Sequence, residues 1–131
     1  MRVIKILAVL GFSCFLHSAS GHVQGLKAVR PIPGYICMLL TPEDELATVQ
    51  SQLPPVLAAP SPTAQIVGYP TGTVFVKWPS HNIGGYAEML RLNWQVGWID
   101  ASHLRPWHPM NNQNGKCVPS VMSDGNPGFG G

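Results

Sequence analysis

Few residues in this chain could perform acid–base, nucleophilic or metal chemistry, because its 131 residues include three cysteines, five histidines and six acids. A glycosidase needs two carboxylates that face one cleft, but three of the acids are consecutive, at positions 43–45. A metal site needs three or more ligands, and Pro106 separates His103 from His108 with no evident third ligand. The Gly-x-Ser-x-Gly turn of many hydrolases is absent. We therefore expect no enzymatic activity, no metal and no cofactor.

The cysteines offer either a disulfide or a reactive thiol. Cys14 lies in an N-terminal segment that we expect to be removed on export, which leaves Cys37 and Cys117. An even number of cysteines in an exported protein is typical of disulfide bonding. The alternative is a nucleophilic Cys37, but the apolar run at 35–40 would raise the pKa of a thiol and make it less reactive. We predict a Cys37–Cys117 disulfide.

Tryptophan and tyrosine side chains are concentrated in the second half of the chain. Both residue types are favoured at binding surfaces, because each combines an apolar ring with a hydrogen-bonding group. Trp94 falls at a predicted hairpin tip, where there is little core to enter. Glu88 and Asp100 are the nearest acids, either ligand contacts or ordinary surface charges. We predict a ligand-binding groove lined by Trp78, Tyr86, Trp94 and Trp98, with a structural role as the alternative for Tyr86 and Trp98.

The N-terminus has the pattern of a secretory signal peptide, predicted to span residues 1–21. Arg2 and Lys5 form a short basic segment, residues 6–16 form an apolar run, and small residues follow. This apolar run is too short for a membrane-spanning helix, which needs about 20 residues. A buried N-terminal element and a lipid anchor at Cys14 are the alternatives. The pattern predicts a periplasmic or secreted protein with no membrane insertion after signal cleavage.

Export also changes the charge balance. Two of the eight basic residues lie in the predicted signal peptide, and the other six equal the six acids in number. A net charge of zero provides no basic surface for nucleic-acid phosphates or for anionic membranes. We therefore expect neither as a partner.

The composition favours one domain of short strands. Hydrophobic residues make up 45% of the chain and charged residues 11%, which permits a folded core. The 14 glycines and 13 prolines favour tight turns over a helical bundle. Short apolar or alternating runs predict strands at 35–40, 64–69, 73–78, 86–92 and 95–100. The predicted fold class is all-β.

Two further segments flank or interrupt these strands. Thr41 as N-cap, Pro42 at the first helical position and the acids that follow predict a helix of about ten residues, ending before Pro54. Residues 108–131 are rich in glycine, proline and asparagine and predict an irregular tail. Cys117 would anchor this tail to Cys37, and we expect residues 120–131, which follow it, to be free.

Several motifs, in order, resemble bacterial SH3-like domains. Residues 56–76 contain an Ala-Pro-Ser segment, a short strand and a Gly-Thr turn before a β-branched strand. Gly85-Tyr86 and Gly97-Trp98-Ile99 stand where the family has Gly-Trp elements. The resemblance covers residues 56–107 and implies a small SH3-like barrel, in which the segment between Ile99 and Leu104 closes the barrel.

The chain departs from this family pattern at two places. The family's strand before the Pro-Ser segment is missing. Either residues 36–40 supply it and the helix is an insertion, or an N-terminal extension at 22–55 caps the domain. Trp94 stands where the family's hairpin usually has glycine, so a simple type I′ turn is not expected.

The resemblance also implies a function. Bacterial SH3-like domains bind cell-wall peptides or protein partners and often accompany wall hydrolases. We expect an exported, non-catalytic module that recognises cell-wall peptide, peptidoglycan or an envelope protein through the aromatic groove. The main alternative is an inhibitor or structural subunit of an envelope complex without cell-wall affinity, using residues 42–53 or the tail. A small catalyst with Cys37 as nucleophile is a third possibility.

Overall fold

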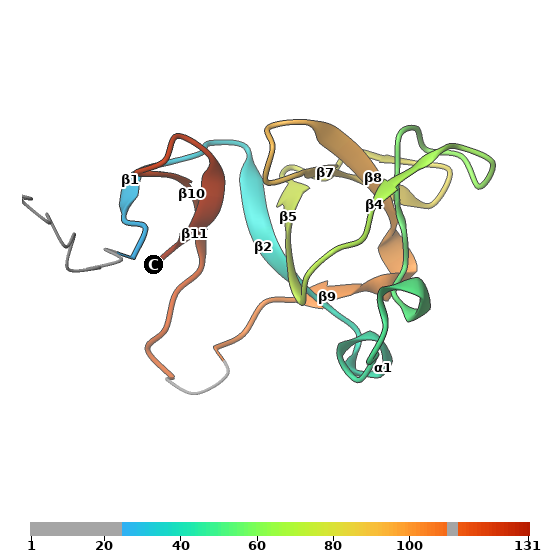
Figure 1. Ribbon diagram of the computed structural model, residues 1–131, viewed down its shortest axis with the longest axis horizontal. Coiled ribbons are helices and arrows are strands. Elements are labelled where there is room, and N and C mark those ends of the chain that lie inside the picture. The colour runs from blue at the N-terminus through green and yellow to red at the C-terminus, as the bar shows by residue number, and fades with distance from the viewer. Residues whose placement is uncertain (1–24, 110–112) are drawn as a thin grey trace, which may run out of the picture.

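The computed structural model describes residues 25–109 and 113–131, so the predicted signal peptide lies outside the described residues. The described chain forms two antiparallel sheets with one short α-helix, which confirms the all-β fold class (Figure 1). No helix in these two ranges is long and apolar enough to cross a membrane.

The larger sheet has eight strands. Seven of them follow the order β4-β3-β8-β7-β5-β2-β9, and β6 pairs with β7 outside this path. Their bounds are β2 Tyr35–Leu40, β3 Val56–Leu57, β4 Ile66–Gly68, β5 Thr73–Lys77, β6 Asn82–Ile83, β7 Tyr86–Leu90, β8 Val96–Asp100 and β9 Leu104–Pro106. A 3-10 turn, η2 (Ala101–His103), connects β8 to β9.

Strand β2 lies inside this sheet, hydrogen-bonded to β5 on one side and to β9 on the other. Of the two alternatives for residues 36–40, the first therefore holds: they supply a strand of the main sheet. The predicted boundary at residue 56 cuts through this sheet, because β2 precedes it in the chain and lies between two strands that follow it. Residues 41–72 are the long connection from β2 to β5.

The sheet curves around one apolar core (Figure 1). Alternation places every second residue of a strand on the inner face. The fully buried members are Leu40, Val56, Val74, Val76, Ala87, Met89 and Ile99. They come from five different strands, so this core can form only when the whole sheet has assembled.

The helix predicted over 42–53 is much shorter than expected. Helix α1 covers only Pro42–Glu45, and a 3-10 turn, η1 (Gln50–Gln52), follows after a break. Most of the expected apolar face has nothing to pack on, since Leu46 is 80% exposed and Val49 is also exposed, and only Leu53, after η1, packs against the core. Without tertiary packing, so short a helix is marginal in water, and the β-branched Thr48 and Val49 weaken it further.

The predicted irregular, free tail is also wrong. Strands β10 (Val118–Met122) and β11 (Pro127–Gly130) form a hairpin, and β10 also pairs with β1 (Ala28–Pro31). Gly125, with φ of 84°, occupies a turn position that favours glycine, and the Asp124 side chain accepts a hydrogen bond from the Asn126 amide in the same turn. The turn formers of this segment therefore close a hairpin rather than mark an unstructured end.

The hairpin covers the outer face of the main sheet beside β2 (Figure 1). A second apolar cluster fills this layer, with Cys37, Phe75 and Leu90 buried on adjacent strands. The Phe129 ring of β11 lies 4.9 Å from the Phe75 ring, measured between centroids. The Cys37–Cys117 disulfide is present, with the two Cα atoms 6.1 Å apart, and confirms the predicted pairing.

Candidate functional site

The four aromatic residues predicted to line one groove lie in different places. Trp78 borders a cavity at one end of β5, and Tyr86 borders another beside η2. Trp98 lies on the outer face of β8, and Trp94 lies in the β7–β8 turn. None of the four main cavities among the described residues is lined by more than one of these aromatic residues.

The cavity beside Trp78 is here called the Trp78 groove. It has the most apolar lining of the four main cavities, and its walls are aromatic. Its volume is about 410 Å³, and Trp107 forms a second aromatic wall. Trp78 follows the last residue of β5 and is 56% exposed, although its backbone amide is fixed by a 2.9 Å hydrogen bond to the Gly34 carbonyl. An indole held at this position presents a large apolar surface to solvent, which is the property of a binding anchor.

The floor of the Trp78 groove comes from strands that are distant in sequence. Ile36 and Met38 lie on β2, Val76 on β5, Ala87 on β7 and Leu104 on β9. The polar side chains of Ser80 and Asn82 also line it. Apolar walls with a few polar groups are typical of small-molecule and peptide sites.

Trp107 was not predicted to belong to the site. Its place opposite Trp78 depends on β9 pairing with β2, which brings the segment after Pro106 to the part of β2 that pairs with the end of β5 on its other side. No local pattern around Trp107 reveals that pairing. The only available signal was its residue type.

Trp98 and Tyr86 share the outer face of the β7–β8 ladder, where Trp98 is opposite Glu88 and Tyr86 is opposite Asp100. The Trp98 ring contacts His81 edge-on, with 5.7 Å between centroids. Glu88 accepts from Lys77 Nζ at 3.3 Å, and its other oxygen lies 3.1 Å from His81 Nδ1. Glu88 is thus one partner in an ion-pair network, and Trp98 packs beside it as a half-buried ring.

Tyr86 lines a smaller cavity of about 260 Å³ with Asp100 and His103. Asp100 Oδ1 accepts hydrogen bonds from the hydroxyl and the backbone amide of Ser102, at 2.7 and 2.9 Å. These two bonds, the hydroxyl first, outweigh partial burial and lower the pKa of Asp100, with nearby His103 acting in the same direction. Asp100 therefore stays ionised and caps η2.

Trp94 has a backbone role that its sequence position only partly indicated. It is the one non-glycine residue of the described chain with positive φ, at 70°. Its Nε1–H donates to the Gly125 carbonyl of the C-terminal hairpin at 2.9 Å, and the ring stays 43% exposed. Trp94 therefore joins the β7–β8 turn to the hairpin rather than entering a groove.

A buried carboxylate connects α1 to η2. Asp44 Oδ2 accepts from the Thr41 hydroxyl at 2.7 Å and lies 2.7 Å from His103 Nδ1. Burial raises the pKa of Asp44, but the hydrogen bonds from Thr41 and His103 and the charge of His103 together lower it below its usual value. These contacts hold the long connection that contains Thr41 and Asp44 against the η2 turn.

Asp44 should make folding stability depend on acid pH. Because its folded pKa lies below the unfolded value of about 3.9, its contribution is complete above that pH and is lost as the pH falls through the folded pKa. We expect Asp44→Asn to lower the unfolding free energy by about 1–3 kcal/mol at pH 7 and to flatten the loss of stability below about pH 4. Urea unfolding at pH 3–7 measures both effects. Glu43→Gln, which removes an exposed charge from the same helix, is the control, and an equal effect there would contradict the role of Asp44.

Comparisons with protein-family models, with curated proteins and with solved structures found no match to this chain. The site must therefore be interpreted from its own geometry.

Proposed function

We propose that this protein is an exported, non-catalytic binding module of the SH3-like type, and that it recognises cell-wall peptide through the Trp78 groove. The strand arrangement supports the SH3-like assignment, because the short η2 turn lies between Ile99 and Leu104, where the resemblance expects the barrel to close. The pairing of β2 with β5 also supports it, because the resemblance expects a strand before the Pro-Ser segment.

One observation carries the binding proposal: Trp78 is 56% exposed beside an apolar groove with a second tryptophan wall. Leaving an indole in water forgoes the free energy of burying it, about 25 cal/mol per Å² of apolar area. A ligand that covers Trp78 and fills the groove recovers that free energy. Fixed aromatic side chains of this kind commonly dominate binding energies.

The disulfide supports the proposed compartment. Disulfides form and persist in oxidising environments and are rare in the cytosol. Cys37 is buried under the hairpin, so its bond to Cys117 is part of the folded structure. A periplasmic or secreted location agrees with the signal-peptide pattern.

Co-sedimentation with purified peptidoglycan sacculi tests the proposal. We expect the oxidised protein to pellet with sacculi and Trp78→Ala to lower its apparent affinity by at least about tenfold, as for a binding hot spot worth about 2 kcal/mol. Trp94→Phe is the matched control, because it alters another exposed tryptophan that lies outside the groove. It should pellet like the wild type.

Equal binding by Trp78→Ala and wild type would show that the Trp78 groove does not bind the cell wall. If none of the proteins pellets with sacculi, the protein does not bind the cell wall. Thermal unfolding of each variant checks that a loss of binding is not a loss of folding.

A specific observation favours the second candidate, an envelope-complex subunit. Leu46 and Val49 are exposed on the connection after α1, next to a cavity of about 520 Å³ that Leu46 helps to line. Exposed apolar residues beside a cavity are typical of protein interfaces. If sacculi fail to bind, cross-linking from position 46 in intact cells should capture a protein partner, and Leu46→Glu should abolish the capture.

A further inference from the structure

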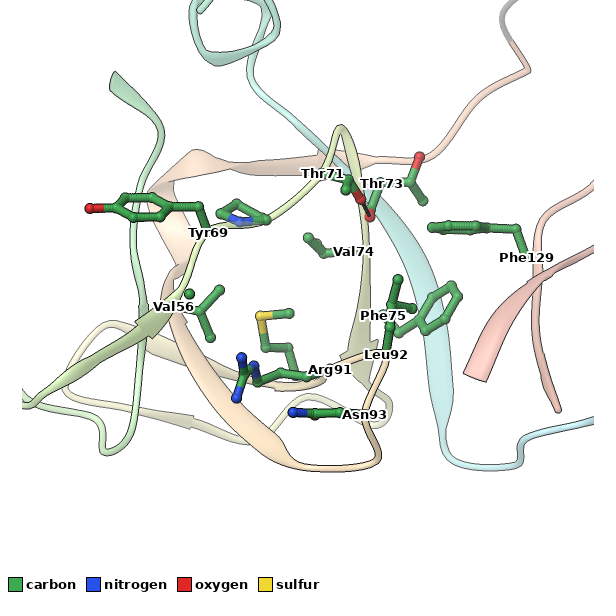
Figure 2. A pocket seen from close by; sticks show the side chains of 13 residues that line it. Val56, Tyr69, Thr71, Thr73, Val74, Phe75, Arg91, Leu92, Asn93 and Phe129 are labelled. Atoms are coloured by element: carbon green, nitrogen blue, oxygen red, sulfur yellow. Dashed lines mark hydrogen bonds between the residues drawn. The ribbon is translucent and has the colours of Figure 1, made fainter. Parts of the chain in front are cut away.

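Another cavity lies at the opposite end of β5 from Trp78 and is here called the Arg91 cavity. Its volume is about 370 Å³, and it shares no lining residue with the Trp78 groove. Val56, Val74 and Met89 of the inner core form its buried apolar floor, and Phe75, from the outer face of β5, also lines it. Figure 2 shows Arg91 and Asn93 next to each other at one side of the cavity.

The Arg91 side chain is held in place at the cavity wall. Its Nη2 donates to the Val67 carbonyl at 2.7 Å, and its Nη1 donates to Gln95 Oε1 at 3.2 Å. Gly68 leaves space beside it, because a Cβ there would lie 3.1 Å from Nη2. The guanidinium is therefore positioned before any ligand arrives, which reduces the entropic cost of binding.

Arg91 has no carboxylate partner. All six acidic residues belong to the described chain, and none of them lies within 4 Å of its guanidinium. Arg105 provides the contrast, because it also donates to a backbone carbonyl at 2.7 Å but forms a 2.8 Å ion pair with Glu45. A partly buried guanidinium bound only to neutral groups retains donors that suit an anion.

The other lining residues define what kind of anion fits. Phosphate sites surround the anion with many donors, such as successive backbone amides at a loop or helix end. Here one guanidinium and one side-chain amide line a largely apolar cavity, with the hydroxyl-bearing Tyr69, Thr71 and Thr73 elsewhere on the wall. Asn93 Oδ1 accepts from the Gln95 backbone amide at 3.0 Å and its Nδ2 donates to Gln95 Oε1 at 3.4 Å, which leaves one Nδ2 hydrogen for a ligand. This combination suits a single planar carboxylate attached to an apolar group.

We propose that the Arg91 cavity binds the C-terminal carboxylate of a peptide whose last residue is apolar. The carboxylate accepts hydrogen bonds from Arg91 and Asn93, and the last side chain covers Val56, Val74 and Met89. The volume lies within the range of about 300–1,000 Å³ that is usual for ligand pockets. This site is separate from the Trp78 groove and does not depend on cell-wall binding.

Titration with short peptides tests the site on the wild-type protein. The probes are acetylated Ala-Ala, Ala-Val, Ala-Leu and Ala-Phe, each as the free acid and as the C-terminal amide. We expect the best acid to bind at least about tenfold more tightly than its amide, since a hydrogen bond to a charged group is worth about 1.5–3 kcal/mol. In NMR spectra the acid should shift the Arg91 Nε–Hε signal. Equal binding of acid and amide, or no binding of either at 10 mM, overturns the proposal.

Matched variants locate the effect. Arg91→Gln should reduce the preference for acid over amide to about onefold, whereas Arg105→Gln, which alters the paired arginine, should leave it unchanged. Arg91→Lys retains the charge without the planar guanidinium, so it should show a reduced preference for acid over amide. This variant takes the place of Arg91→Gln if Arg91→Gln does not fold. Trp78→Ala should bind the acid normally, so failure of the cell-wall proposal and failure of this one are distinguishable. An unchanged preference in Arg91→Gln would overturn the assignment.

Discussion

Removing the Cys37–Cys117 disulfide should lower the free energy of unfolding by about 4 kcal/mol, because the bond closes a long loop in the unfolded chain. The two cysteines are 80 residues apart, so the bond restricts most of the described chain. For a domain of this size the loss corresponds to a fall in melting temperature of roughly 15–20 °C. Urea and thermal unfolding of Cys37→Ala/Cys117→Ala measure it directly.

Reduction provides the matched control for this variant. Wild-type protein in dithiothreitol should match the double variant, and the double variant should not respond to dithiothreitol. The native hairpin should persist at low temperature without the bond, because β10 still pairs with β1 and Phe129 still contacts Phe75. A loss below about 1 kcal/mol would contradict the loop-entropy account and would mean that the reduced, unfolded chain is already restrained.

The sequence predicted the parts of the fold that depend on local patterns. Alternation in residues 73–78 placed Val74 and Val76 on one face, and both are buried in the inner core. The disulfide followed from cysteine number and compartment alone. The prediction of the helix failed because Leu46 and Val49 have no partner surface, and that of the free tail failed because its strand pairs with β1, about 90 residues earlier in the chain.

The candidate sites were harder to predict for the same reason. Trp78 was predicted to share a groove with Tyr86, Trp94 and Trp98, whereas the cavity that it borders is shared with Trp107, which only the pairing of β9 with β2 brings there. No sequence motif around Arg91 marks it as a binding residue. Its significance lies in the carboxylate that it lacks and in the Val67 carbonyl and Gly68, which only the folded chain brings beside it. Residue type indicates chemistry, whereas long-range pairing determines which residues act together.

Phe75→Ala should lower the free energy of unfolding by about 3–5 kcal/mol, the usual cost of removing a buried phenylalanine ring. Phe75 is 1% exposed and lies on the outer face of β5, between the main sheet and the hairpin. Its neighbours in that layer come from several elements: Cys37 on β2, Leu90 on β7 and Phe129 on β11. The cavity would therefore open at the contact between the two sheets rather than inside one of them. Urea unfolding followed by tryptophan fluorescence measures the loss.

Phe129→Ala is the natural comparison, since it removes the other ring of the same aromatic contact. Phe129 is 45% exposed, so its removal should cost only about 1–2 kcal/mol. Hydrogen exchange in β10 then distinguishes two ways of losing stability. If the two sheets unfold as one cooperative unit, Phe75→Ala should speed exchange in β10 and in β7 by similar factors. Faster exchange confined to β10 would show that the hairpin opens by itself, and the Cys37–Cys117 bond would then be what holds it on the sheet.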